Sequence, residues 1–163
     1  CAKNGFHPCY FNPTDAVIEL AQIYVEEGAK HGHNFRLGER QNIVRQTRIA
    51  PSMAELEKRV MKYDIDIFKN FYSVFSNHSV DRADPSDAAA FEAMKNTNFM
   101  TGGTVDEAIR YWTGIFNQAP FEYITLIWHF AQQPKDLVLE ELGLFMEKVL
   151  PELDVPDYAI AAE

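Results

Sequence analysis

The sequence predicts an α/β protein with a parallel sheet, on three observations. Segments with strand character alternate with helical segments along the 163 residues, which is the order of β–α–β units. The segment Phe121–Phe130 is almost continuously apolar, as a parallel strand covered on both faces should be. A complete (β/α)8 barrel typically needs about 250 residues, so the length excludes one. Three strands alone cover one another poorly, and we therefore expect the chain to be part of a larger assembly.

The first half of the chain is expected to hold two strands. Phe6–Phe11 is rich in aromatic residues and ends at Asn12-Pro13, which is typical of a strand followed by a turn. Thr14 is the expected N-cap of the next helix, which Gly32 would end. A second strand is expected over Gln41–Ala50. Alternate residues of this strand would share one face: Val44, Gln46, Arg48 and Ala50.

A long helix is expected to follow this second strand. Ser52–Glu55 matches a capping box, in which a hydroxyl and a carboxylate satisfy two free amide groups at a helix start. The residues at helical spacing after it form the expected buried stripe, namely Leu56, Val60, Tyr63, Ile67 and Phe71.

The region 76–103 is polar and is expected to be a lid-like insertion with one short helix near Asp87–Lys95. Thr104–Glu107 is a second capping box, and it starts a helix that runs to about Phe116. Ala108, Ile109 and Trp112 are expected to point inward from this helix.

A last strand is expected over Phe121–Phe130, and Pro134 then suits the first turn of a last helix. Pro151 would end that helix, and the acidic tail 154–163 is expected to be frayed. The expected core stripe of the last helix is Val138, Leu139, Leu142, Phe145, Met146, Val149 and Leu150.

Composition narrows the class of partner. Lys and Arg total 15 and Asp and Glu total 24, so the net charge of −9 disfavours a nucleic-acid ligand.

No segment has the ~18 continuous apolar residues of a membrane-spanning helix, so no membrane association is expected. Cys1 and Cys9 match no disulfide framework, which favours reduced thiols and a cytoplasmic protein. His31 and His33 lack an evident third ligand, so no metal site is expected.

Four segments, in order along the chain, resemble one known family. Ala2–Phe6 resembles the end of its fifth helix, and Val44–Glu55 resembles its penultimate strand with the helix start that follows. Gly102–Ile109 resembles its Gly-Thr-x-(Asp/Glu)-Glu helix start. Pro120–Leu153 resembles its last strand and last helix, including the closing Val-Leu-Pro-Glu-Leu. The family is that of the bacterial-luciferase-like, flavin-dependent monooxygenases, which are (β/α)8 barrels that use FMN or coenzyme F420.

The resemblance implies a register for the chain. Residues 1–163 would form a single partial domain, the C-terminal part of the (β/α)8 TIM barrel, with about three βα units that carry strands six to eight. The polar insertion would be the family's mobile loop near the mouth of the active site. In the family, the loop after strand five helps to bind the flavin phosphate, and the first four strands supply much of the catalytic pocket. No catalytic residue is therefore assigned in this chain.

The resemblance also implies where cofactor contacts would lie, because a barrel carries its active site at the carboxyl ends of its strands. Arg45 and Arg48 are expected to face the anionic flavin or a substrate oxyanion. Trp128 would stack on or wall the flavin ring, and His129 would donate to a peroxide or a carbonyl oxygen. The substrate pocket is expected to include Tyr10 and Asn12.

Each candidate cofactor contact also has a purely structural interpretation. Arg45 and Arg48 could pair with acidic residues such as Glu55, and Trp128 could be a core residue. His129 could serve either role.

The leading hypothesis is the C-terminal portion of a luciferase-like flavin monooxygenase that oxidises a small organic substrate with reduced flavin and O2. FMN is favoured over F420, and a separate flavin reductase would supply the reduced FMN. The further partner would be the N-terminal barrel half or a second copy of the chain. One alternative is a non-catalytic half-barrel that dimerises to cover the open edges of its sheet. Another is an unrelated α/β binding module.

Overall fold

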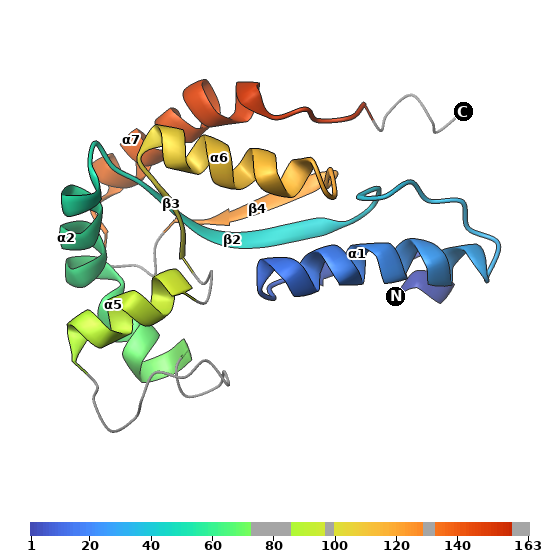
Figure 1. Cartoon of the computed structure of the whole chain (residues 1–163), viewed down its shortest axis with the longest axis horizontal. Helices are drawn as coiled ribbons and strands as arrows, with labels where there is room; N and C mark the ends of the chain where they lie inside the picture. The colour runs from blue at the N-terminus through green and yellow to red at the C-terminus, as the bar shows by residue number, and fades with distance from the viewer. Residues whose placement is uncertain (73–85, 97–99, 129–132, 158–163) are drawn as a thin grey trace.

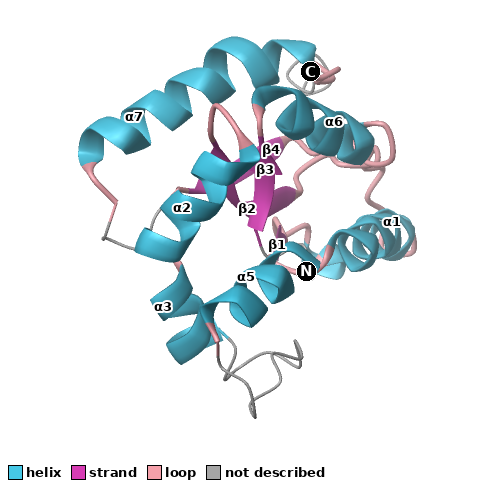
Figure 2. Ribbon diagram, turned by 60° about the vertical axis from the view of Figure 1, so that its left-hand side comes forward, coloured by secondary structure: helices cyan, strands magenta, loops and turns pink. Residues whose placement is uncertain are grey.

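The computed structural model describes residues 1–72, 86–96, 100–128 and 133–157. Within them, a parallel sheet lies at the centre and helices surround it, which confirms the predicted α/β class (Figure 1, Figure 2). The strands are β1 (Cys9–Tyr10), β2 (Asn42–Ile49), β3 (Met100–Gly103) and β4 (Tyr123–Ile127). The α-helices are α1 (Thr14–Ala29), α2 (Met53–Tyr63), α3 (Ile65–Ile67), α5 (Asp87–Asn96), α6 (Val105–Phe116) and α7 (Lys135–Leu144). Shorter 3-10 or π-helical segments are η1 (Ala2–Asn4), η2 (Phe68–Tyr72), η3 (Phe145–Val149) and η4 (Leu150–Glu152).

Strand β2 is the centre of the sheet, and all its pairings are parallel. Asn42 pairs with both Cys9 and Tyr123. Further along β2, Gln46 pairs with both a residue of β3 and a residue of β4. A strand has two edges, so β1 and β3 follow one another along one edge of β2, and β4 occupies the other edge.

Strand β3 was not predicted, so the expectation of three strands in the chain is wrong by one. Gly102 and Gly103 are disfavoured in strands, and Met100–Gly103 shows no strand alternation. The strand forms because glycine allows an unusually close approach. A Cβ built on Gly102 would lie 2.0 Å from the carbonyl oxygen of Arg48, and the φ of Gly102 is +117°. The predicted short helix in the insertion is confirmed by α5, whereas 76–85 and 97–99 lie outside the described residues.

The helix starts follow local chemistry to different degrees. The Thr104 hydroxyl accepts from the backbone N–H of Glu107, whose side chain accepts from Thr104, so the predicted capping box at α6 is confirmed. Ser52 caps α2 by accepting from the N–H of Glu55. The predicted N-cap of α1 is wrong by one residue, because Pro13 is the N-cap and Thr14 is the first helical residue.

Two apolar clusters hold these elements together. The larger lies between β2 and helices α1, α6 and α7, and its members include Ile43, Ile49 and Trp112. The smaller lies at the carboxyl end of β2, where α2 and α5 pack (Figure 1). Of the stripe predicted for α2 and its continuation, Leu56 and Val60 are buried, Tyr63 and Ile67 are half-buried, and the side chain of Phe71 lies outside the described residues.

The predicted core stripe of the last helix is only partly correct. Phe145 and Val149 are buried, but Leu139, Leu142 and Met146 are exposed. The buried position on α7 is instead Glu141, whose hydrogen bonds fix which face of the helix turns inward. The helical segment continues past Leu144 as π and 3-10 turns as far as Glu152.

Strand β4 is less covered than its sequence predicts. It spans Tyr123–Ile127 within the predicted 121–130, and Tyr123 is 44% exposed. The reason is its position, since its one described strand neighbour is β2. No helix in the described segments has the length and apolarity needed to cross a bilayer. Residues 154–157 of the tail lie outside helices and strands, and 158–163 lie outside the described residues.

Candidate functional site

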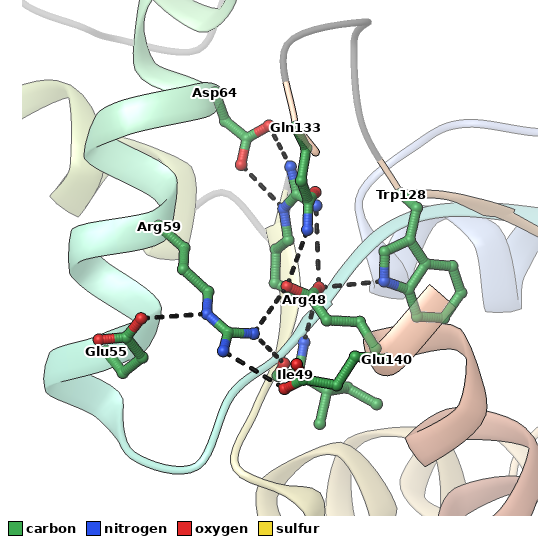
Figure 3. Close-up of polar contacts among 9 residues, drawn as sticks. Arg48, Ile49, Glu55, Arg59, Asp64, Trp128, Gln133 and Glu140 are labelled. Atoms are coloured by element: carbon green, nitrogen blue, oxygen red, sulfur yellow. Dashed lines mark hydrogen bonds and ion pairs between the residues drawn. The ribbon is translucent and has the colours of Figure 1, made fainter. Parts of the chain in front are cut away.

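The carboxyl ends of β2 and β4 carry a buried polar cluster (Figure 3). Its centre is the carboxylate of Glu141 in α7, which is fully buried. Oε1 accepts hydrogen bonds from Arg59 Nη1 and Gln133 Nε2, each over 3.0 Å. Oε2 accepts from the indole Nε1 of Trp128 over 3.0 Å and from the backbone N–H of Ile49 over 3.3 Å. One carboxylate therefore joins two strand ends, α2 and α7.

Arg48 forms the second half of the cluster. Its Nε donates to Asp64 Oδ2 over 2.8 Å, and its Nη2 donates to Asp64 Oδ1, so the pair is bidentate. Its Nη1 lies 3.7 Å from Glu141 Oε2, too far for a hydrogen bond. Arg48 and Asp64 are both buried, and an arginine keeps its charge in such a place. The structure thus holds a fixed positive charge at the end of β2.

Arg59 connects this cluster to the surface. Besides Glu141, its guanidinium pairs with Glu55 over 3.3 Å and with Glu140 over 3.4 Å. The hydrogen bond from Arg59 lowers the pKa of the Glu55 carboxyl below its ordinary value. Burial raises the pKa of Glu141, and the positive charges of Arg48 and Arg59 oppose that rise. The cluster therefore balances two buried carboxylates against two buried guanidinium groups.

Several buried polar atoms in this region have no hydrogen-bond partner among the described residues. These atoms are both side-chain atoms of Gln46, Nη1 of Arg48 and Oε1 of Gln133. Gln46 and Arg48 are two residues apart on β2, so their side chains leave the same face of the sheet. That face lies opposite Ile43 and Ile49, which pack against the helices.

Arg45 lies apart from Arg48, so the two predicted cationic contacts do not form one site. Arg45 is buried on the face of β2 that packs against the helices. Its Nε donates to Tyr111 Oη over 2.8 Å, its Nη1 donates to the carbonyl of Val44 over 2.8 Å, and its Nη2 reaches Thr14 Oγ1 over 3.5 Å. These three hydrogen-bond partners are all neutral.

Trp128 is a buried side chain whose indole is fixed on two sides. Its N–H is donated to Glu141, and its ring meets Phe145 edge-on, with 5.9 Å between centroids. Phe145 also contacts the ring of Trp112 edge-on. Trp128 thus belongs to the larger apolar cluster and, through Glu141 Oε2, also adjoins Arg48. His129 lies outside the described residues.

The two predicted substrate-pocket residues have different surroundings. Tyr10 is a core residue whose hydroxyl donates to Gln41 Oε1 over 3.0 Å, and burial raises the pKa of its phenol. Asn12 is exposed directly after β1. The structure does not bring Tyr10 into the polar cluster.

Sequence reasoning missed Glu141, Asp64, Gln133 and Gln46. Asp64 and Glu141 could have been found from the sequence, because each is an acid at helical spacing within an apolar stripe. Asp64 follows Leu56 and Val60 at steps of four, and Glu141 precedes Phe145 by four. A charge on a buried helix face requires a partner, which is a signal of a polar site.

Neither of the two pockets described next, each of about 280 Å³, is lined by Arg45, Arg48, Trp128, Tyr10 or Asn12. An apolar pocket beside β4 is lined by Phe116, Phe121, Glu122, Ile124, Leu126, Phe145, Met146, Leu150 and Val155. A second, at the amino ends of the strands, is lined by His7, Pro8, Cys9, Asn42, Tyr123, Ile124 and Thr125. Within the described segments, no three metal-ligating side chains gather at one point.

No family model matches the chain, and no curated protein matches it. Solved structures do share its fold. The first is the oxygenating constituent of 3,6-diketocamphane monooxygenase from the CAM plasmid of Pseudomonas putida, a type II Baeyer-Villiger monooxygenase in complex with FMN. It superposes with a TM-score of 0.69 at 20% identity over 95% of this chain and 45% of that one.

The monooxygenase RslO1 from Streptomyces bottropensis superposes with a TM-score of 0.61 at 15% identity, over 92% of this chain and 43% of that one. The chain therefore spans less than half the length of these two solved structures. At such identities the likeness concerns the fold.

Proposed function

We propose that this chain is the C-terminal part of a flavin-dependent monooxygenase barrel, where it supplies strands six to eight. In that role β1, β2 and β4 correspond to the three barrel strands, and β3 belongs to the insertion between them. The observation that carries the proposal is the match of 95% of this chain to an FMN-bound monooxygenase that is more than twice as long. The order of the parallel strands around β2 supports the same register.

The buried polar atoms of the sheet are suited to a flavin. Gln46 and Arg48 leave unpartnered donor and acceptor atoms on the face of β2 opposite α1 and α6, which would face the interior of a closed barrel. A polar, planar ring with hydrogen-bonding edges could use these atoms, whereas an apolar ligand could not. The FMN bound to the first structural neighbour favours FMN over F420 for this chain.

Reduced FMN, when bound, would supply the two electrons with which one oxygen atom of O2 enters the substrate and the other leaves as water. Arg48 would place its fixed charge near the ring and so stabilise the negative charge of reduced flavin. The bidentate pairing with Asp64 would hold the guanidinium in one orientation. Arg45 is not assigned this role, because its guanidinium lies on the helix side of β2.

Trp128 would close the carboxyl end of the barrel and exclude water from the reacting atoms. Its indole is suited to this role because Glu141 and Phe145 prevent it from rotating. His129, next in the chain, would donate to a substrate oxygen, and Asn12 would line the substrate pocket from the end of β1. The substrate would be a small organic molecule, and a separate reductase would supply the reduced FMN.

The exposed edge strand favours one second candidate, a non-catalytic half-barrel that dimerises. Tyr123 of β4 is exposed, as are Leu142 and Met146, and Met146 lines the apolar pocket beside β4. A second copy could cover these groups.

One experiment separates the two candidates. The polypeptide that contains this chain, with any segment encoded in frame with it, is titrated with FMN and with anaerobically reduced FMN while its mass in solution is measured. Quenching of flavin fluorescence at one site per chain is expected. A dimer that binds neither form of flavin would overturn the proposed function in favour of the half-barrel. Five further strand–helix units encoded upstream of Cys1 would support the barrel register.

A further inference from the structure

The amide of Gln46 is the least explained polar group in the described structure. Its side chain is 0% exposed in the middle of β2, and neither Nε2 nor Oε1 has a hydrogen-bond partner. A buried amide that loses water without gaining a partner destabilises the folded state. A methionine would fill the same space without that penalty, so the position is better suited to binding than to stability.

The unpartnered atoms gather in one place. Four of the five buried side-chain atoms without a partner belong to Gln46, Arg48 and Gln133, and the fifth is the indole nitrogen of Trp112. Arg48 leaves the same face of β2 as Gln46, and both Arg48 and Gln133 approach the carboxylate of Glu141 (Figure 3). The clustering indicates one shared binding partner rather than unrelated packing defects.

The chemistry of these atoms limits what could bind. Gln46 Nε2 and Arg48 Nη1 are donors, whereas Gln46 Oε1 and Gln133 Oε1 are acceptors. A carboxylate or a phosphate has acceptors alone and would leave the two amide oxygens unpaired. An edge on which carbonyl oxygens flank an N–H would pair with both donors and with the acceptor of Gln46. The pyrimidinedione ring of a flavin has such an edge at its N3 position.

We propose that Gln46 and Arg48 form the subsite for the pyrimidinedione edge of the flavin. Gln46 Oε1 accepts from the N3–H, and Gln46 Nε2 and Arg48 Nη1 donate to the two carbonyl oxygens beside it. This assignment rests on the proposed function, because it takes the ligand to be a flavin. Gln46 is thereby a binding residue, while Asp64 positions the guanidinium of Arg48.

The first test needs no flavin. The variant Q46M removes the unpartnered amide, and its melting temperature is expected to rise by roughly 2–10 °C. The matched control is T47V, at the next residue of the same strand. Thr47 is equally buried, but its hydroxyl contacts Thr101 Oγ1 over 3.1 Å, so T47V is expected to lower the melting temperature. A melting temperature of Q46M below that of the wild type would show a satisfied amide and overturn the assignment.

The second test compares FMN with FMN methylated at N3, by flavin fluorescence quenching on the polypeptide that contains this chain. The wild type is expected to bind the methylated form about tenfold or more weakly, because the methyl group replaces the donor that Gln46 accepts. Q46M is expected to bind both flavins alike. Equal affinity of the wild type for the two flavins overturns the subsite and leaves the proposed function standing. Failure of the wild type to bind either flavin overturns the proposed function itself.

Discussion

Trp128 donates its indole N–H to the carboxylate of Glu141 over 3.0 Å, and this bond ties the end of β4 to α7. The same carboxylate accepts from Ile49 at the end of β2 and from Arg59 in α2. A single buried side chain thus connects the elements on which the proposed flavin site would be built. Its removal is expected to disturb the site and the fold together.

The variant E141L is expected to lower the free energy of unfolding by about 3–5 kcal/mol, measured by urea denaturation. Leucine fits the volume but removes the one buried carboxylate that pairs with Arg59 and the acceptor of the Trp128 indole N–H. The control is E140Q on the same helix, since Glu140 is exposed and pairs with Arg59 only at the surface. E140Q is expected to change the free energy by less than about 0.5 kcal/mol. Equal effects of the two variants would contradict a central role for Glu141.

The two buried arginines of β2 are expected to differ in their effect on stability. R48M leaves the buried carboxylate of Asp64 unpaired and is expected to cost about 3–5 kcal/mol. R45M removes a cation that donates to the neutral Tyr111 hydroxyl and Val44 carbonyl, and it is expected to cost no more than about 2 kcal/mol. Urea denaturation of both variants gives the comparison. The double variant R48M/D64L should recover part of the loss, and a loss larger than that of R48M alone would count against the pair.

Gly102 is expected to tolerate no side chain. In G102A the new Cβ would meet the carbonyl oxygen of Arg48 at 2.0 Å, at a φ that alanine rarely adopts. We expect a loss of more than about 3 kcal/mol, or a protein that does not fold. Gly114 in α6 is the matched control, because a Cβ there meets nothing within 4 Å. G114A is expected to gain about 0.5–1 kcal/mol, and similar melting temperatures for both variants would refute the close approach of β3 to β2.

The capping box of α6 predicts a pH dependence. The hydrogen bond from the backbone N–H of Thr104 lowers the pKa of Glu107 below its ordinary value of 4.5. A carboxyl with a lowered folded-state pKa stabilises the fold above the ordinary value, and this contribution disappears as the pH falls through the folded-state pKa. The stability difference between wild type and E107Q should therefore shrink as the pH is lowered from 5 to about 3. For the control D106N, at an exposed residue of the same turn, the stability difference from wild type should change less with pH. A stability difference between wild type and E107Q that stays constant with pH would contradict the capping box.

Helix positions could be predicted because their signals are local. The Thr104 and Glu107 groups that start α6 are three residues apart, and each satisfies an amide of the other without help from the rest of the chain. The same holds for Ser52 and Glu55 at α2. Such caps can be recognised in one sequence because the two residues that form them lie within one helical turn.

The polar cluster could not be predicted as a unit, because its partners are distant in the sequence. Arg59 and Glu141 are 82 residues apart, and Arg48 finds its acid on the segment after α2 rather than at Glu55. The structural interpretation of Arg48, pairing with an acid, is thus realised with Asp64, which sequence reasoning had not named. The position of Trp128 is likewise fixed by a distant element, because its indole N–H donates to Glu141 on the buried face of α7.

By itself, the sequence determined the alternation of strands and helices, the caps that start α2 and α6, and a length too short for a complete barrel. These features follow from nearest neighbours, periodicity and residue counts. Tertiary structure alone decided that β3 joins the sheet through Gly102, that Arg45 and Arg48 face opposite sides of β2, and that Glu141 turns inward. Each of these outcomes depends on which distant group arrives beside a side chain, because a buried charge or a close backbone contact is stable only with its specific partner.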